Sequence, residues 1–134
     1  MNRRSLREQV FKLLFRAEFN KPEEMPEQER LFFESGDLVA TPEDEAKIID
    51  KCEKILVRIP ELDAEISKKL EGWKIERLGK VELTILRLAV YEILFDEAVP
   101  AGAAINEAVD LAKKFGQDNS GQFINGILAG FAKE

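Results

Sequence analysis

The sequence contains no histidine and only one cysteine, Cys52, among its 134 residues. Histidine is the commonest general base near neutral pH and the commonest metal ligand, so its absence removes most hydrolytic and metal-dependent active sites. One cysteine cannot form an internal disulfide, and without histidine it cannot build a zinc site or a Cys/His nucleophile pair. We therefore expect a protein that is not an enzyme and that holds no metal and no cofactor.

Long apolar runs and phosphate-binding loops are also missing. The most apolar segment, LTILRLAVYEILF at 83–95, is shorter than a membrane span and is interrupted by Arg87 and Glu92. No charged and then apolar signal peptide precedes it, and the G-x-x-x-x-G-K-S/T spacing of a phosphate loop does not occur. These absences favour a cytoplasmic protein without a membrane partner.

Apolar residues recur with helical spacing throughout the chain. In the first segment they share one helix face, at Leu6, Val10, Leu13, Leu14 and Ala17. The same spacing returns over 27–35, 41–59, 60–71, 80–95, 105–115 and 120–131. Segment 80–95 is apolar nearly all round, which predicts a central helix surrounded by the others. The expected fold is an all-α bundle of about seven helices.

Capping signals mark where several of these helices begin and end. Polar N-caps are expected at Ser5, at Thr41, and at Asp118 or Ser120. Glycines just past the last apolar residue are expected to end helices at Gly36 and Gly116. Because Cys52 lies on the apolar face of the helix that begins at Thr41, we expect its thiol to be buried and structural.

The net charge of −6 hides an uneven distribution along the chain. Residues 1–21 carry six cations against two carboxylates, whereas residues 22–45 carry nine carboxylates against Arg30. An acidic protein is an unusual partner for nucleic acid, but attraction depends on the local field within a Debye length of roughly 8–10 Å. The basic end must therefore be judged on its own.

A stripe of arginines and aromatic residues lies beside the apolar face of the first helix. Its members, at i, i+3, i+7 and i+11, are Arg4, Arg7, Phe11 and Phe15. Arginine binds phosphate with a bidentate fork, and exposed rings stack on unpaired bases, so the stripe suits single-stranded RNA. Positive charge at a helix N-terminus opposes the macrodipole, so a bound anion gains more from these arginines than the fold does. In the alternative interpretation, both phenylalanines widen the core and the arginines form a solvated helix start.

Three segments of the chain resemble one family. RLGKVELTILRLAVYEILF, VPAGAAINEAVDLAKKFG and NSGQFINGIL are similar to segments of the NusB family of bacterial transcription antitermination factors, and the arginine-rich first helix matches the family's expected start. The resemblance implies an all-helical fold of two subdomains, here 1–72 and 73–134. It also implies binding to boxA single-stranded RNA together with NusE, a ribosomal protein of the small subunit. In that family the complex helps RNA polymerase read through terminators, notably in ribosomal RNA operons.

The resemblance assigns roles to individual positions. The residues that it implies face RNA are Arg3, Arg4 and Arg7 of the first helix, Phe15, and Asn119 and Phe123 at the start of the last helix. Glu76 and Glu82, on either side of RLGKV, resemble positions that face the protein partner. Gln122 departs from the pattern, because relatives can carry a lysine there. Losing that cation reduces the salt dependence of binding by roughly one phosphate contact.

Other functions remain open at the level of sequence. A helical protein-interaction module without RNA would use the acidic segment 22–45 or the turn 76–82 to recruit a basic partner. The family's helical module also occurs fused to a ribosomal RNA cytosine methyltransferase, but this chain ends at Glu134, and we expect no methyltransferase activity of its own. The oligomeric state of the free protein is open too, since a homodimer would cover Phe11 and Phe15 if both are exposed.

Overall fold

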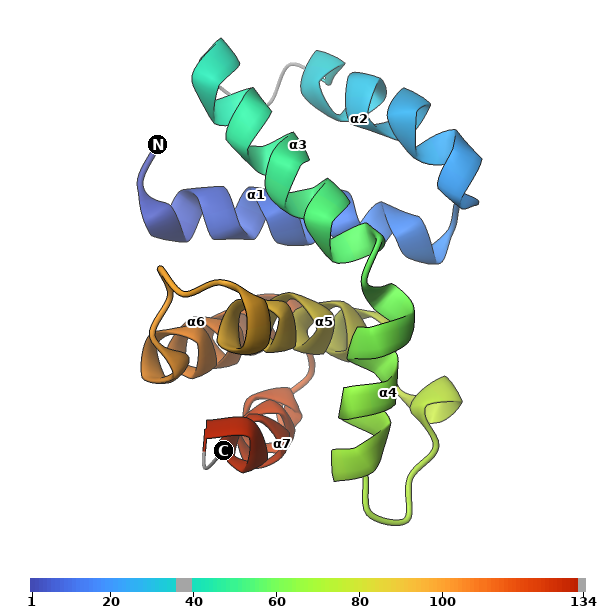
Figure 1. Cartoon of the computed structure of the whole chain (residues 1–134), viewed down its shortest axis with the longest axis vertical. Helices are drawn as coiled ribbons and strands as arrows, with labels where there is room; N and C mark the ends of the chain where they lie inside the picture. The colour runs from blue at the N-terminus through green and yellow to red at the C-terminus, as the bar shows by residue number, and fades with distance from the viewer. Residues whose placement is uncertain (36–39, 133–134) are drawn as a thin grey trace. The chain divides into compact units, whose positions relative to one another are not determined.

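The computed structural model describes residues 1–35 and 40–132, and within these ranges it contains seven α-helices and no β-strand (Figure 1). The α-helices are α1 (Arg3–Phe15), α2 (Met25–Glu34), α3 (Pro42–Leu56), α4 (Ile59–Lys69), α5 (Lys80–Phe95), α6 (Ala101–Phe115) and α7 (Ser120–Ala132). Three short 3₁₀ helices join them: η1 (Arg16–Glu18), η2 (Pro22–Glu24) and η3 (Ile75–Arg77). The predicted all-α fold of about seven helices is confirmed. The predicted helix stop at Gly36 lies outside the described residues.

The chain divides into two compact units, Met1–Val57 and Arg58–Glu134. This boundary lies between α3 and α4, whereas the expected division into 1–72 and 73–134 places α4 in the first subdomain. The difference arises because α4 packs on α5 and α7. The Asp63 carboxylate on α4 also accepts two hydrogen bonds from the Arg87 guanidinium on α5, each 2.8 Å long. Helix α4 is therefore part of the second unit.

The core of the first unit forms where α3 lies across α1 (Figure 1). Its central side chains are all at most 2% exposed: Val10, Leu13, Leu14, Ile48, Cys52 and Ile55. The predictions of an apolar face on the first helix and of a buried Cys52 are confirmed. Burial, together with the nearby carboxylates of Glu29 and Glu53, raises the pKa of the Cys52 thiol to about 12. The thiol is therefore kept protonated, which is the unreactive form.

The sequence predicts one of the two N-caps of the first unit correctly. At α3, Thr41 Oγ1 accepts a hydrogen bond from the Asp44 N–H at 3.1 Å, and the Asp44 carboxylate accepts one from the Thr41 N–H at 3.3 Å. At α1 the predicted Ser5 cap is wrong, because Asn2 Oδ1 accepts a hydrogen bond from the Ser5 N–H at 2.8 Å. Asparagine caps a helix as well as serine does. With Asn2 as the cap, the helix begins at Arg3, earlier than predicted.

Helix α5 is the central element of the second unit, as predicted. It contacts α4, α6 and α7, and every residue of 83–92 except Arg87 is buried. Helix α6 ends at Gly116, also as predicted, where the Gly116 N–H donates to the Ala112 carbonyl at 2.8 Å. A Cβ at this position would lie only 2.7 Å from that carbonyl oxygen, so the tight turn requires glycine. The turn brings the start of α7 beside the start of α5.

Candidate nucleic-acid interface

Arginines cluster at the start of α1. Arg3 and Arg4 are exposed, and the first turn of the helix contains no acidic residue. Because a helix N-terminus carries a partial positive charge of its own, these side chains add to a field that attracts anions. Arg7, one turn further along, is only 9% exposed. Of the three arginines expected to face RNA, Arg3 and Arg4 are therefore the accessible ones.

Aromatic rings continue along α1 and past its end. Phe15 is half-buried, stacks on Phe11 with ring centroids 6.1 Å apart, and meets Phe19 edge-on at 5.2 Å. The expectation that Phe11 is exposed is wrong, because the residue is only 3% exposed. Phe11 is adjacent to Val10 and one turn before Leu14, so the core stripe is wide enough to include it. A homodimer therefore has no Phe11 surface to cover.

Phe19 is the exposed aromatic residue of the first unit that the sequence interpretation missed. It is 62% exposed and directly contacts Phe15. Its spacing of four residues from Phe15 was an available signal, because side chains four apart meet on a helical surface. The aromatic surface at the end of α1 thus consists of Phe15 and Phe19 rather than Phe11 and Phe15.

The second group of candidate residues lies at the start of α7. Asn119 is exposed and Phe123 is half-buried. Ser120, one of the two predicted caps, uses its hydroxyl differently: it accepts a hydrogen bond from the Gln117 N–H and donates one to Glu82 Oε2, each at 2.9 Å. Ser120 therefore fixes the loop that precedes α7, and with it the backbone that carries Asn119.

The two glutamates expected to face a protein partner lie in different surroundings. Glu76 is exposed on η3. Glu82 is half-buried; one of its carboxylate oxygens accepts the Ser120 hydrogen bond and the other lies against Gly79. The structure thus brings Glu82 to the start of α7 and leaves Glu76 on a separate exposed turn.

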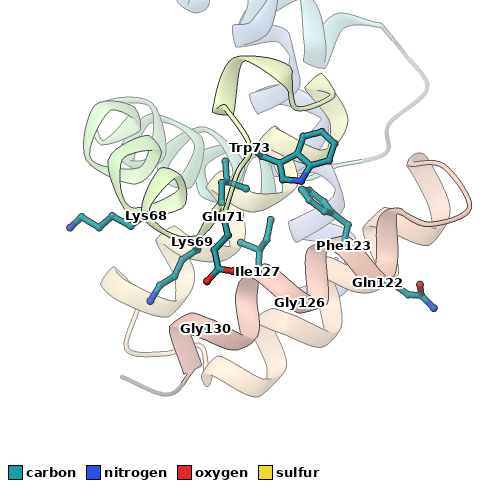
Figure 2. A pocket seen from close by; sticks show the side chains of 10 residues that line it. Lys68, Lys69, Glu71, Trp73, Gln122, Phe123, Gly126, Ile127 and Gly130 are labelled. Atoms are coloured by element: carbon teal, nitrogen blue, oxygen red, sulfur yellow. The ribbon is translucent and has the colours of Figure 1, made fainter.

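Phe123 also lines an open groove of about 660 Å³ between the end of α4 and α7 (Figure 2). The groove residues that matter for its chemistry are Lys68, Lys69, Glu71, Trp73, Phe123 and Gly126. Trp73 is the only tryptophan of the chain and is 61% exposed. The sequence interpretation missed it because it lies between helices, where no periodic pattern marks it, and far along the chain from Phe123.

The expected RNA-facing residues therefore form two groups, one in each unit. In the first unit, the exposed guanidinium groups of Arg3 and Arg4 lie at the start of α1 and the ring of Phe15 lies at its end. The second group combines the exposed amide of Asn119 with the ring of Phe123. Both units thus carry hydrogen-bond donors and an aromatic ring, the residue types that bind phosphates and unpaired bases.

Two further features concern the described residues as a whole. Within 1–35 and 40–132, no three or more His, Cys, Asp or Glu side chains are grouped so that they would hold a metal ion. None of the helices in these ranges combines the length and the apolar character needed to cross a membrane.

Residues 4–133 match the NusB family. The transcription antitermination protein NusB of Agathobacter rectalis is 50% identical in a 134-residue alignment that covers 98% of this chain and 100% of that protein. The solved structure of T. maritima NusB has a TM-score of 0.87 at 37% identity, covering 100% of this chain and 92% of that one. A crystal structure of the antitermination factors NusB and NusE in complex with dsRNA has a TM-score of 0.83 at 29% identity, covering 98% and 96%. The chain belongs to the NusB family.

Proposed function

We propose that this chain is an RNA-binding transcription antitermination factor that acts together with NusE, the small-subunit ribosomal protein. Membership of the NusB family supports this proposal, and so does the solved complex in which NusB and NusE hold RNA. We further propose that the RNA is boxA-like and that the complex makes RNA polymerase read through terminators, notably in ribosomal RNA operons. The protein would act in the cytoplasm, and no catalytic step is part of the proposal.

The start of α1 is the observation that carries this proposal. Arg3 and Arg4 are exposed at the positive end of the helix dipole, and the first turn contains no acidic residue. Cations at this end of a helix oppose its dipole. A phosphate chain is attracted both by the guanidinium groups and by the partial positive charge of the helix end.

Each candidate residue has a role in the proposed complex. Arg3 and Arg4 bind phosphates, and Arg7 supports them from its buried place on the same helix. Bases contact the ring of Phe15 in the first unit and the side chains of Asn119 and Phe123 in the second. The residues assigned to the protein partner are Glu76 and Glu82. With Gln122 in place of a lysine, we expect one phosphate contact fewer.

A titration of labelled boxA RNA with the full chain, with and without NusE and at two salt concentrations, tests the proposal. We expect weak binding to the chain alone, tighter binding with NusE, and weaker binding at the higher salt because phosphate contacts release counterions. Because the solved NusB–NusE complex holds double-stranded RNA, a duplex of the same sequence is titrated in parallel.

Absent binding with NusE supplied, or binding that does not depend on salt, would refute the RNA part of the proposal. Normal NusE binding without any cross-linking of RNA to residues 3–15 would instead identify a protein-interaction module that does not use RNA.

A further inference from the structure

We propose that the groove between the end of α4 and α7 binds one nucleotide of single-stranded RNA, with its base against Trp73 and Phe123 and its phosphate at Lys68 and Lys69. The inference deepens the proposed RNA-binding function and rests on it. The whole groove lies within the second unit, so it needs no residue of α1.

One end of the groove offers aromatic faces. Figure 2 shows the Trp73 indole and the Phe123 ring together at this end. An indole that is 61% exposed has most of its surface available to a ligand. Unpaired bases stack on such rings whatever their sequence, because every base has a π-face. This end is therefore suited to a nucleobase.

The other end of the groove is basic. Lys68 and Lys69 form the last turn of α4, and Figure 2 shows both side chains extending from that end. The Lys68 ammonium pairs with Glu65 at 2.9 Å, but this pair is exposed, and exposed pairs are weak enough for a phosphate to compete. The Lys69 ammonium lies 5.4 Å from the centre of the Phe131 ring. Two cations on one rim favour an anionic ligand even though the whole chain is acidic.

Glu71 is the acidic group of the groove. Its carboxylate lies in the groove near Lys69 and Ile127 (Figure 2). A carboxylate accepts hydrogen bonds, and an RNA nucleotide donates them from its 2′-hydroxyl and from base amino groups. The lining of the groove therefore holds two lysines and one glutamate, and Glu65 pairs with Lys68 at the rim.

A glycine keeps the floor of the groove open. A Cβ added at Gly126 would meet no atom within 4 Å, so packing does not require glycine at this helical position. Glycine inside a helix is destabilising relative to alanine. The fold therefore leaves space beside Gly126 that its own packing does not require. The volume of about 660 Å³ is within the usual range of ligand sites.

The occupant favoured by these features is RNA rather than a protein segment. The groove is continuous along α7 with Phe123 and lies close in sequence to Asn119, the residues assigned to bases in the proposed function. An acidic peptide would satisfy the lysines but has no need of the exposed Trp73 indole beside the half-buried Phe123 ring. A nucleotide uses both ends of the groove at once, with its base at the rings and its phosphate at the lysines.

The intrinsic fluorescence of Trp73 reports on this groove directly, because the chain has no other tryptophan. We expect a short single-stranded oligoadenylate or oligouridylate to change the emission of the full chain in a saturable, salt-dependent way. In Gly126→Leu, whose side chain fills the floor, the affinity should fall by roughly fivefold or more, the equivalent of losing one stacked base. Gly102→Leu is the matched control: Gly102 is also helical, also has no atom within 4 Å of an added Cβ, and lies on α6.

A second variant keeps the proposal testable if Gly126→Leu does not fold. Trp73→Ala removes an exposed side chain, and we expect weaker binding of labelled RNA by anisotropy. If wild-type RNA binding by anisotropy is normal but the emission of Trp73 never changes, the groove proposal is overturned while the proposed function stands. If boxA RNA does not bind by either method even with NusE supplied, the proposed function itself fails. Equal quenching by polyglutamate, in competition with RNA, would make the groove a peptide site and would also overturn the proposal.

Discussion

Arg3 and Arg4 lie where the fold gains least from positive charge. Both are exposed at the N-terminus of α1, where each cation opposes the macrodipole by about 0.3 kcal/mol or more. Arg7 is different, because it is only 9% exposed and a substitution there would also disturb packing. Tests of RNA binding should therefore use Arg3 and Arg4, whose replacement leaves the core of the first unit untouched.

Cys52 gives the protein a specific sensitivity to alkaline pH. Burial raises its pKa from 9.0 to about 12, so the folded state holds the thiol proton more tightly than the unfolded chain does. The resulting stabilisation is complete below pH 9 and decreases as the pH rises toward 12, by at most about 1.4 kcal/mol per pH unit. Urea unfolding over this interval should show that decrease.

The Cys52→Ala variant is the comparison for this prediction. It should be less stable than the wild type at neutral pH because it leaves a cavity. It should nevertheless lose less stability than the wild type between pH 9 and 12, since the thiol is gone. Parallel losses in the two proteins would show that Cys52 does not govern alkaline stability.

At the level of elements, the start of α3 depends on its capping box. Thr41→Ala removes the side-chain acceptor of the Asp44 N–H and should lower the free energy of unfolding by about 1 kcal/mol. The Thr41 N–H also holds the pKa of the Asp44 carboxyl below its ordinary value of 3.8. This hydrogen bond stabilises only the ionised carboxylate. Its contribution to the stability of the fold is therefore present above pH 3.8 and is lost on further acidification. An unchanged unfolding midpoint for Thr41→Ala would contradict the capping role.

The loop between α6 and α7 depends on Ser120. Ser120→Ala removes the acceptor of the Gln117 N–H and the donor to Glu82, and should reduce stability by about 1 kcal/mol or somewhat more. Hydrogen exchange of the Gln117 amide should accelerate relative to amides of α5. In a double-mutant cycle with Glu82→Ala, we expect a coupling energy of at least about 0.5 kcal/mol. Additive effects would mean that Glu82 does not act through Ser120.

Helix starts and ends could be predicted where local geometry alone decides them. Thr41 with Pro42 and the tight turn at Gly116 are of this kind, because their effect depends only on neighbouring backbone atoms. Asn2 was missed in favour of Ser5 because the two residues cap equally well, and the sequence does not rank two candidates three residues apart.

At the scale of the whole molecule, the unpredicted features are contacts between residues that lie far apart in the chain. Arg87 with Asp63 assigns α4 to the second unit, and Ser120 with Glu82 joins two helix starts. Trp73 shares a groove with Phe123 that no local pattern reveals. Periodicity predicts which face of a helix is buried, but not which helix covers it, so the all-α class was predictable and the division into units was not.

Charge is also organised at this scale. The chain carries a net charge of −6, yet two cations adjoin at the start of α1, at Arg3 and Arg4, and two at the end of α4, at Lys68 and Lys69. Since screening limits each charge to roughly 8–10 Å, the acidic remainder repels RNA elsewhere without cancelling these two places. The distribution favours RNA binding confined to a small part of the surface.

The affinity of the Arg3→Ala, Arg4→Ala double variant for boxA RNA, measured with NusE present, tests the central claim most directly. The control is Lys47→Ala, Lys54→Ala, which removes the same charge from exposed positions of α3. We expect the arginine variant to fold normally, to bind more weakly, and to lose about 1.4 from the slope of log affinity against log salt, while the control keeps wild-type values. Equal affinities and equal slopes for the two variants would contradict an RNA-binding role for α1.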